Sequence, residues 1–187
     1  MESSSRLRWP VRLATPLAVA ALLWSSSPAL PAGVSLAVGS VTVARSSSGR
    51  FAVTLTGTGV AGLQNDVAFD VANTPIAVGA RGGPDCTSAL SQTVRFAFLP
   101  AGCAGRSCTR MRAVITSLNG STIPSGATLY TCRVAVPSTA SAGSHALVVP
   151  STAASPLVAS STAGAVLPLG ASNGTVTVTS QCTGGCC

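Results

Sequence analysis

The stretch GLQNDVAFDV, residues 62–71, alternates between apolar and polar positions. In an extended chain Leu63, Val67 and Phe69 point to one side, and Asn65 shares that side with them. The opposite side carries Gln64, Asp66, Ala68 and Asp70. A period of two over this length indicates a β-strand with one buried face.

Further segments with β-branched or aromatic residues follow the same pattern, and turn-forming sequences such as SSSG, RGGPD and NGSTIPSG separate them. They are residues 34–44, 51–59, 74–80, 93–99, 111–118, 128–136, 144–149 and 174–180. With residues 62–71 this makes about nine short strands and no amphipathic helix. The sequence therefore predicts an all-β sandwich or barrel. The Ala/Ser/Thr/Pro-rich residues 150–172 are expected to form an extended connection with little regular structure.

Residues 1–32 have the organisation of a secretory signal peptide. Arg6, Arg8 and Arg12 precede the apolar residues 13–24, and small residues follow, with cleavage expected after Ala29 or Ala32. The apolar stretch is too short for a relaxed membrane span, although an uncleaved N-terminal anchor is the alternative. We therefore expect an exported protein, extracellular or at the cell surface, with no stable membrane span after cleavage. Residues 33–180 are expected to form one domain and residues 181–187 a disordered Cys/Gly-rich tail.

The charge and aromatic content exclude several functions. Beyond residue 32 the chain has eight arginines, no lysine and three acids, Asp66, Asp70 and Asp85. It has five aromatic residues there, none of them Trp, so it lacks the stacking side chains that nucleic-acid binders combine with clustered basic groups. The arginines are expected to keep an otherwise uncharged surface soluble.

All seven cysteines follow the predicted signal, which in an exported chain favours disulfides over metal ligands or catalytic thiols. The four in the body, Cys86, Cys103, Cys108 and Cys132, allow three pairings. One of these closes the loop between Cys103 and Cys108 and leaves Cys86 to Cys132. Cys182, Cys186 and Cys187 are expected to give at most one pair and a free thiol, rather than a metal site.

No catalytic or metal-ligating set emerges from the polar residues. Asp66 and Asp70 lie about 13 Å apart along a straight strand, too far for a pair of glycosidase carboxyl groups. We expect Asp70 to end the strand and bind the following turn through Asn73, and Asp66 to be solvated; a calcium role is the alternative. His145, the only histidine, is expected at a strand edge facing water, because no G-x-S-x-G element supports a Ser–His–Asp set.

Two further predictions concern the side chains that face the core or a ligand. Asn65 is expected to be buried and hydrogen-bonded to backbone groups. Tyr130, Phe96 and Phe98 are the aromatic residues that could stack on a sugar ring, but Phe96 and Phe98 share one strand face, as core residues do. With one Tyr and no Trp, the chain beyond residue 32 is poorly supplied for an aromatic sugar platform, which weakens direct carbohydrate binding.

The order of the segments resembles the cohesin-like domains of exported bacterial proteins. VSLAVGSVTVA and FAVTLTGTG come first, VAGLQNDVAFD follows with Phe69-Asp70 at an aromatic-Asp position, and IPSGATLYTCRVAV, SAGSHALVV and NGTVTV complete the series over residues 33–180. The resemblance implies a nine-stranded antiparallel β-sandwich of jelly-roll topology, in which the first and last strands lie together. The four body cysteines depart from the well-studied members, and no D-x-[DN]-x-[DN]-G calcium loop is present.

The resemblance implies a non-catalytic binding module without a cofactor, which docks a dockerin-type protein partner or a polysaccharide. The alternative is a module that binds carbohydrate directly, and a hydrolase is disfavoured by the few acids and single histidine. The sequence leaves the contact residues open.

Overall fold

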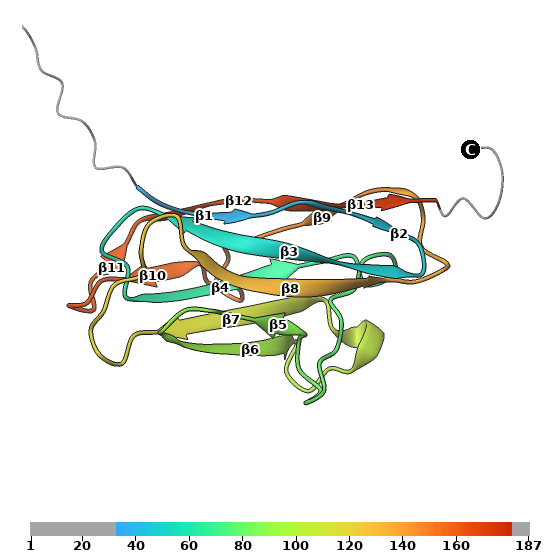
Figure 1. Cartoon of the computed structure of the whole chain (residues 1–187). Helices are drawn as coiled ribbons and strands as arrows, with labels where there is room; N and C mark the ends of the chain where they lie inside the picture. Colours follow the sequence, from blue (N-terminus) through green and yellow to red (C-terminus); the bar gives the residue numbers. More distant parts are fainter. Residues whose placement is uncertain (1–32, 181–187) are drawn as a thin grey trace, which may run out of the picture.

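A computed structural model describes residues 33–180, which form an all-β sandwich (Figure 1). The predicted signal peptide and the Cys/Gly-rich tail lie outside the described residues. Within residues 33–180 no helix is long and apolar enough to cross a membrane. The one helical element among these residues is a short 3₁₀ turn, η1 (Gly105–Ser107).

Two five-stranded sheets form the layers of the sandwich. The first has the order β12-β1-β3-β8-β5 and the second the order β11-β10-β4-β7-β6. The strands of the first sheet are β12 (Leu169–Ser172), β1 (Val34–Val38), β3 (Ser47–Thr56), β8 (Thr128–Val136) and β5 (Cys86–Thr87). Those of the second are β11 (Val166–Leu167), β10 (Val158–Ser160), β4 (Gly62–Ala68), β7 (Arg110–Thr116) and β6 (Thr93–Leu99).

A third sheet contains β2 (Val41–Ala44), β13 (Gly174–Thr179) and β9 (Gly143–Leu147), with β13 in the middle. The end of the chain therefore lies beside its beginning: β12 pairs with β1 and β13 pairs with β2, both in parallel. Gly174 makes this approach possible, because a Cβ at that position would clash with the carbonyl oxygen of Gly39. The expectation that the first and last strands lie together is met, but their pairing is parallel, so the sandwich is not purely antiparallel.

The strand count differs from the predicted nine for identifiable reasons. Residues 34–44 break at Gly39-Ser40, and the two halves join different sheets. Residues 150–172 contain β10, β11 and β12, although their composition predicted little regular structure. Their backbone groups hydrogen-bond the otherwise open edges of β4 and β1, and such ladders form despite weak side-chain propensity.

The predicted strand at residues 74–80 is wrong. This segment makes only isolated bridges, from Ile76 to Val134 and from Val78 to Pro84. Pro75 has no N–H to donate, and the chain turns back at Gly82, whose φ is 80°. Ile76 nevertheless remains in the core.

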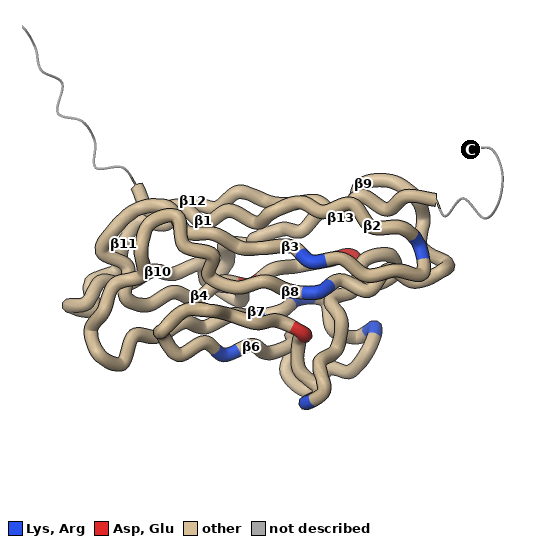
Figure 2. Tube along the Cα trace, viewed as in Figure 1, with Lys and Arg blue, Asp and Glu red and all other residues tan. Residues whose placement is uncertain are grey.

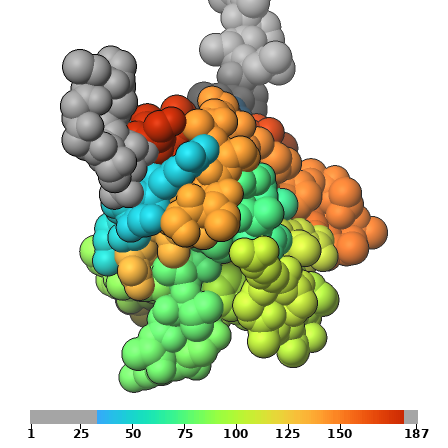
Figure 3. Space-filling model, turned by 90° about the vertical axis from the view of Figure 1, so that its right-hand side faces the viewer, coloured from blue at the N-terminus to red at the C-terminus, as the bar shows by residue number. Residues whose placement is uncertain are grey.

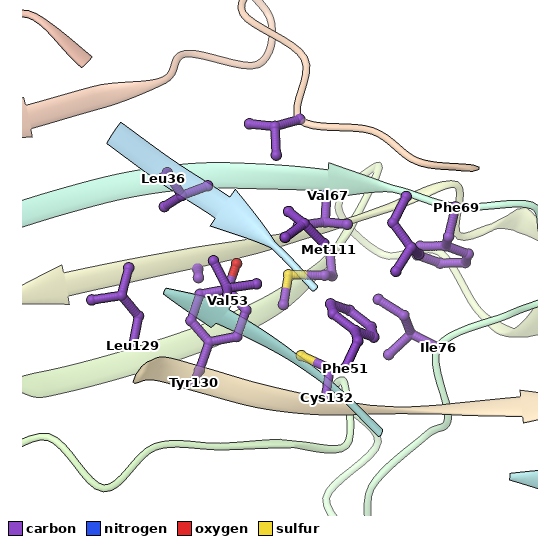
Figure 4. Close-up of a cluster of buried hydrophobic side chains, with 14 of the residues drawn as sticks. Leu36, Phe51, Val53, Val67, Phe69, Ile76, Met111, Leu129, Tyr130 and Cys132 are labelled. Atoms are coloured by element: carbon purple, nitrogen blue, oxygen red, sulfur yellow. The ribbon is translucent and has the colours of Figure 1, made fainter. Parts of the chain in front are cut away.

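The core lies between the two five-stranded sheets, and its side chains come from alternate positions of both (Figure 4). Phe51, Val53 and Leu55 of β3 are buried on one face, as their spacing predicts. Phe51 and Val53 lie near Val67 of β4 and Met111 of β7 in the core. Each fully buried aliphatic or aromatic side chain of this kind contributes about 1.5–3 kcal/mol of transfer free energy. The outward positions of the same strands are thereby left to form the two outer faces of the sandwich.

Candidate binding face

The outward side chains of β4, β7 and β6 stand in rows across the second sheet. The register places Gln64, Val114 and Arg95 in one row, with Val114 in the middle, and Asp66, Arg112 and Ala97 in another, with Arg112 in the middle. Val158 of β10 continues the first row on the other side of Gln64. We name this surface the β4–β7 face; its residues are Gln64, Thr93, Arg95, Ala97, Arg110, Arg112, Val114, Thr116 and Val158.

Asp66 stands on this face but is not solvated, and that prediction is wrong. Its side chain is fully buried beneath Arg112, whose Nε and Nη2 donate to the two carboxylate oxygens at 2.6 and 3.0 Å. Arg110 Nη1 lies 3.9 Å from the same carboxylate. The hydrogen bond to Asp66 raises the pKa of Arg112, outweighing the opposite effect of its partial desolvation. The face therefore presents arginine to solvent and conceals its only carboxylate.

The two arginines also hold the segment that precedes β10. Arg112 Nη2 donates to the carbonyl oxygen of Ala154 at 3.3 Å, and Arg110 donates to the hydroxyl of Ser155, which is buried. These contacts fix residues 154–155 against one side of the β4–β7 face. A sequence reading missed them, because the partners are about 45 residues apart.

A shallow hollow of about 280 Å³ lies in the face over the first half of β4, and Gly62 is part of its lining. A Cβ at Gly62 would lie 2.7 Å from Ser160 Oγ, so a larger residue there would require the Ser160 side chain to move. Apolar side chains are exposed on and beside this end of the face: Val158 is 37% exposed, Val166 of β11 is 77% exposed and Leu118, just after β7, is 83% exposed. The face thus combines cationic, amide and apolar groups around a depression.

The outer face of the first sheet is plainer. Its charged groups on β1, β3 and β8 are Arg50 and Arg133. The other outward positions carry small residues, among them Ser35, Ala37, Ala52, Thr54 and Thr131. Arg133 is already engaged by Asp85, whose Oδ2 lies 2.6 Å from its Nε. Figure 2 shows how few charged positions the described trace carries and that most are basic. Binding energy at interfaces concentrates on arginine and large apolar groups, so the β4–β7 face is the better candidate.

Beneath this face Asn65 is buried, as predicted, but its partner is a side chain. Its Nδ2 donates to the hydroxyl oxygen of Tyr130 at 2.7 Å, which links β4 to β8 across the core. Asn65 Oδ1 makes no hydrogen bond among the described residues. Burial raises the pKa of Tyr130 far above its usual value, which the hydrogen bond from Asn65 only partly offsets.

Tyr130 is therefore a core residue and is not available to stack on a sugar ring. Its ring packs edge to face against Phe96 with the centroids 5.4 Å apart. Phe96 and Phe98 point inward on β6, as their spacing predicts, and are half-buried against the core. The described residues thus provide no fully exposed aromatic platform.

Asp70 ends the β4 segment and binds the turn that follows, as predicted. Its carboxylate accepts hydrogen bonds from the N–H groups of Ala72 and Asn73 and from Asn73 Nδ2, the last at 2.7 Å. Although desolvation raises the pKa of this carboxyl group, the hydrogen bonds from Asn73, His145 and Ala72 together lower it below the usual value.

His145 does not face water, contrary to the prediction. Its Nδ1 lies 2.9 Å from Asp70 Oδ2, and its Nε2 lies 3.0 Å from the carbonyl oxygen of Ser141. Its side chain is 11% exposed. Asp66 and Asp70 are thus held by separate partners, and the structure does not bring them together as a catalytic pair. Among residues 33–180 no group of three or more His, Cys, Asp or Glu could hold a metal ion.

The four body cysteines form two disulfides in the structure. Cys86 pairs with Cys132, joining β5 to β8, and Cys103 pairs with Cys108 across the loop that contains η1. Of the three pairings that the sequence allows, this is the one that closes the short loop between Cys103 and Cys108. Two disulfides in one sandwich fit an oxidising environment.

Comparison with solved structures identifies the fold. The chain is similar to the type I cohesin of the Coh-OlpA-Doc918 cohesin–dockerin complex from Clostridium thermocellum, with a TM-score of 0.63 and 9% identity over 79% of this chain and 99% of that one. For the seventh ScaB type I cohesin from Pseudobacteroides cellulosolvens the TM-score is 0.62, with 12% identity over 81% of this chain and 95% of that one. For a non-cellulosomal cohesin from the archaeon Archaeoglobus fulgidus the TM-score is 0.59, with 17% identity over 79% of this chain and 92% of that one.

No protein-family model matches the sequence, and no curated protein matches it. At these identities the comparisons show the fold: the chain is a β-sandwich with the architecture of type I cohesin domains. The resemblance inferred from the order of strand and turn segments is confirmed at that level.

Proposed function

We propose that this chain is an exported, non-catalytic binding module that docks a dockerin-type protein partner through its β4–β7 face, in extracellular assembly or polysaccharide breakdown. The observation that carries the proposal is the β4–β7 face, where arginines and exposed apolar groups surround a hollow while Asp66 is buried. The similar cohesin from Clostridium thermocellum was solved in complex with a dockerin, which supports the choice of partner.

The charge of the face defines the chemistry of the partner. Arg95 is exposed and makes no ion pair among the described residues, and Arg112 retains a side chain that is 26% exposed. A partner surface with acidic or amide groups beside an apolar contact is complementary to this arrangement. Direct carbohydrate binding is less well supported, because Tyr130 is buried and Phe96 and Phe98 point inward.

The test is a binding measurement between the purified chain and isolated dockerin modules from exported proteins of the same organism, by surface plasmon resonance. We expect saturable binding that weakens with added salt. Replacing Arg95→Glu or Val158→Asp should lower the affinity by about tenfold or more, as expected for interface anchors. Arg50→Glu makes the same charge change on the opposite face and should leave the affinity within about twofold.

Two results would contradict the proposal. One is the absence of binding to every dockerin module tested. The other is an equal loss for Arg50→Glu and Arg95→Glu, which would reflect net charge instead of a specific face. A polysaccharide array probed with the same protein tests the alternative of direct carbohydrate binding. Binding to a polysaccharide without binding to any dockerin would support a carbohydrate-binding module in place of a dockerin receptor.

A further inference from the structure

At the end of the sandwich where β4, β6 and β8 finish, the two sheets leave a hollow of about 380 Å³. Figure 3 looks onto this end and shows the loop around residues 75–85, in green, and the loop around residues 100–108, in yellow-green, as two projecting lobes. The hollow is lined by residues 69, 71, 75–78, 98, 105, 106, 108 and 135–137. None of these belongs to the β4–β7 face.

The lining is mostly apolar, and several of its side chains pack against one another or in the core. Phe69 and Phe98 contact each other edge to face with their ring centroids 6.5 Å apart, and Ile76 is 3% exposed. Val78 is 54% exposed and is among the few large apolar side chains in solvent. Cavities of a few hundred Å³ with such walls are typical of sites for small apolar ligands.

One charged residue belongs to the lining. Arg106 lies in η1, within the loop that the disulfide between Cys103 and Cys108 closes, and its side chain is exposed. It makes no hydrogen bond or ion pair in the described part of the chain, where Asp66, Asp70 and Asp85 are each engaged by other residues. A guanidinium with five donors is thus free to bind an anion beside an apolar hollow.

We propose that this hollow is a binding site for an aliphatic carboxylate, such as a medium-chain fatty acid. The chain lies against Phe69, Ile76 and Val78, and its carboxylate pairs with the Arg106 guanidinium. A carboxylate fits because its two oxygens match the paired N–H groups of one guanidinium. The proposal goes beyond partner docking and does not depend on it, since the two sites share no residue.

The experiment is a calorimetric titration of the purified chain with decanoate, and with 1-decanol as the uncharged analogue, both below the concentrations at which they aggregate. We expect decanoate to bind at one saturable site and decanol to bind more weakly. Arg106→Gln removes the charge from an exposed position and should weaken decanoate binding by about tenfold while leaving decanol binding unchanged. Arg50→Gln, an exposed arginine on β3, is the matched control and should bind decanoate as the wild type does.

A second variant tests the apolar part of the site. Val78→Glu places a carboxylate among the lining residues at a position that is mostly exposed, so the fold should persist, and circular dichroism checks this. It should weaken both decanoate and decanol binding. The proposal is overturned if decanoate shows no saturable binding, or if Arg106→Gln binds decanoate as tightly as the wild type. It is also overturned if Val78→Glu, still folded, leaves both affinities unchanged.

The two proposals can fail separately. Loss of the decanoate result with intact dockerin binding would contradict this site and leave the proposed function standing. Decanoate binding without dockerin binding would contradict the proposed function and leave this site standing.

Discussion

At the scale of single residues, Asn65 and Asp66 show how alternation and burial are separate properties. The period of two directs Asn65 inward and Asp66 outward, and the structure agrees with both directions. Both are nevertheless fully buried, Asn65 by the opposite sheet and Asp66 by the arginines above it. A buried carboxylate without such partners would cost several kcal/mol, so Arg112 is what makes an aspartate tolerable there.

The bond from Asn65 to Tyr130 gives a prediction at this scale. Tyr130→Phe removes the acceptor and leaves a buried amide without a partner, so we expect a loss of about 1–3 kcal/mol in the free energy of unfolding. Urea denaturation followed by circular dichroism measures it. The double variant Asn65→Leu with Tyr130→Phe replaces both groups by apolar ones of similar shape and should be less destabilised than Tyr130→Phe alone. A double variant at least as destabilised as the single one would contradict this account of the bond.

At the scale of elements, Asp70 connects the end of β4 to the start of β9. Its carboxylate binds the turn at residues 72–73 and contacts His145 of β9, while Asn73 Oδ1 accepts a hydrogen bond from the N–H of Ser141 at 2.8 Å. Two segments about 70 residues apart are thus joined by one cluster of polar side chains. The same loops form part of the end of the sandwich where the hollow lies.

This cluster predicts a dependence of stability on pH. The pKa of Asp70 is lower in the folded protein than in the unfolded chain, where an aspartate titrates near pH 4. Between the folded and unfolded pKa values the unfolded state binds more protons, so the contribution of Asp70 is present above about pH 4 and is lost as the pH falls through the folded pKa. Asp70→Asn should abolish this contribution, so wild type and variant should differ in stability at pH 6 and converge as the pH falls through the folded pKa of Asp70. Urea denaturation across this range measures the difference, and a constant difference at all pH values would contradict the assignment.

At the scale of the whole molecule, the two disulfides constrain loops of very different length. The sequence separation is 46 residues for Cys86–Cys132 and 5 residues for Cys103–Cys108. The first ties β5, a strand of only two residues, to β8 in the first sheet, so it fixes the edge of that sheet. The second closes only the local loop around η1.

The loop lengths predict unequal contributions to stability. By the loop-entropy relation the longer disulfide stabilises the fold by about 4 kcal/mol and the shorter one by about 2 kcal/mol. We therefore expect Cys86→Ala with Cys132→Ala to lower the free energy of unfolding roughly twice as much as Cys103→Ala with Cys108→Ala. Urea denaturation of both double variants under oxidising conditions measures this. Equal losses would show that local packing, instead of chain entropy, dominates.

Much of the scaffold could be predicted from local pattern. Alternation identified β3, β4, β6, β7, β8 and β13. Each of these strands has one face against the core, so apolar and polar residues alternate along its sequence. It failed for residues 74–80, where Pro75 and the turn at Gly82 prevent a ladder. It also failed for residues 150–172, where the outcome depends on which strand edges remain open after the rest has folded. Local propensity carries no information about that.

The candidate sites were less predictable than the scaffold. Asp66 and His145 were expected in water because their partners, Arg112 and Asp70, are 46 and 75 residues away. The hollow beside Arg106 is formed by loops from three parts of the chain, and no contiguous motif marks it.

The sequence by itself determined that the body of the chain is a series of short strands typical of a β-sandwich, because periodicity and turn residues are local features, and that the order of these strands resembles cohesin-like domains. Only the tertiary structure decided that Asp66 is concealed, that arginine dominates the β4–β7 face, and that an apolar hollow opens at one end. Each of these depends on groups far apart in the chain being brought within a few ångströms, and the free energy of such contacts is set by burial and geometry that exist only after folding.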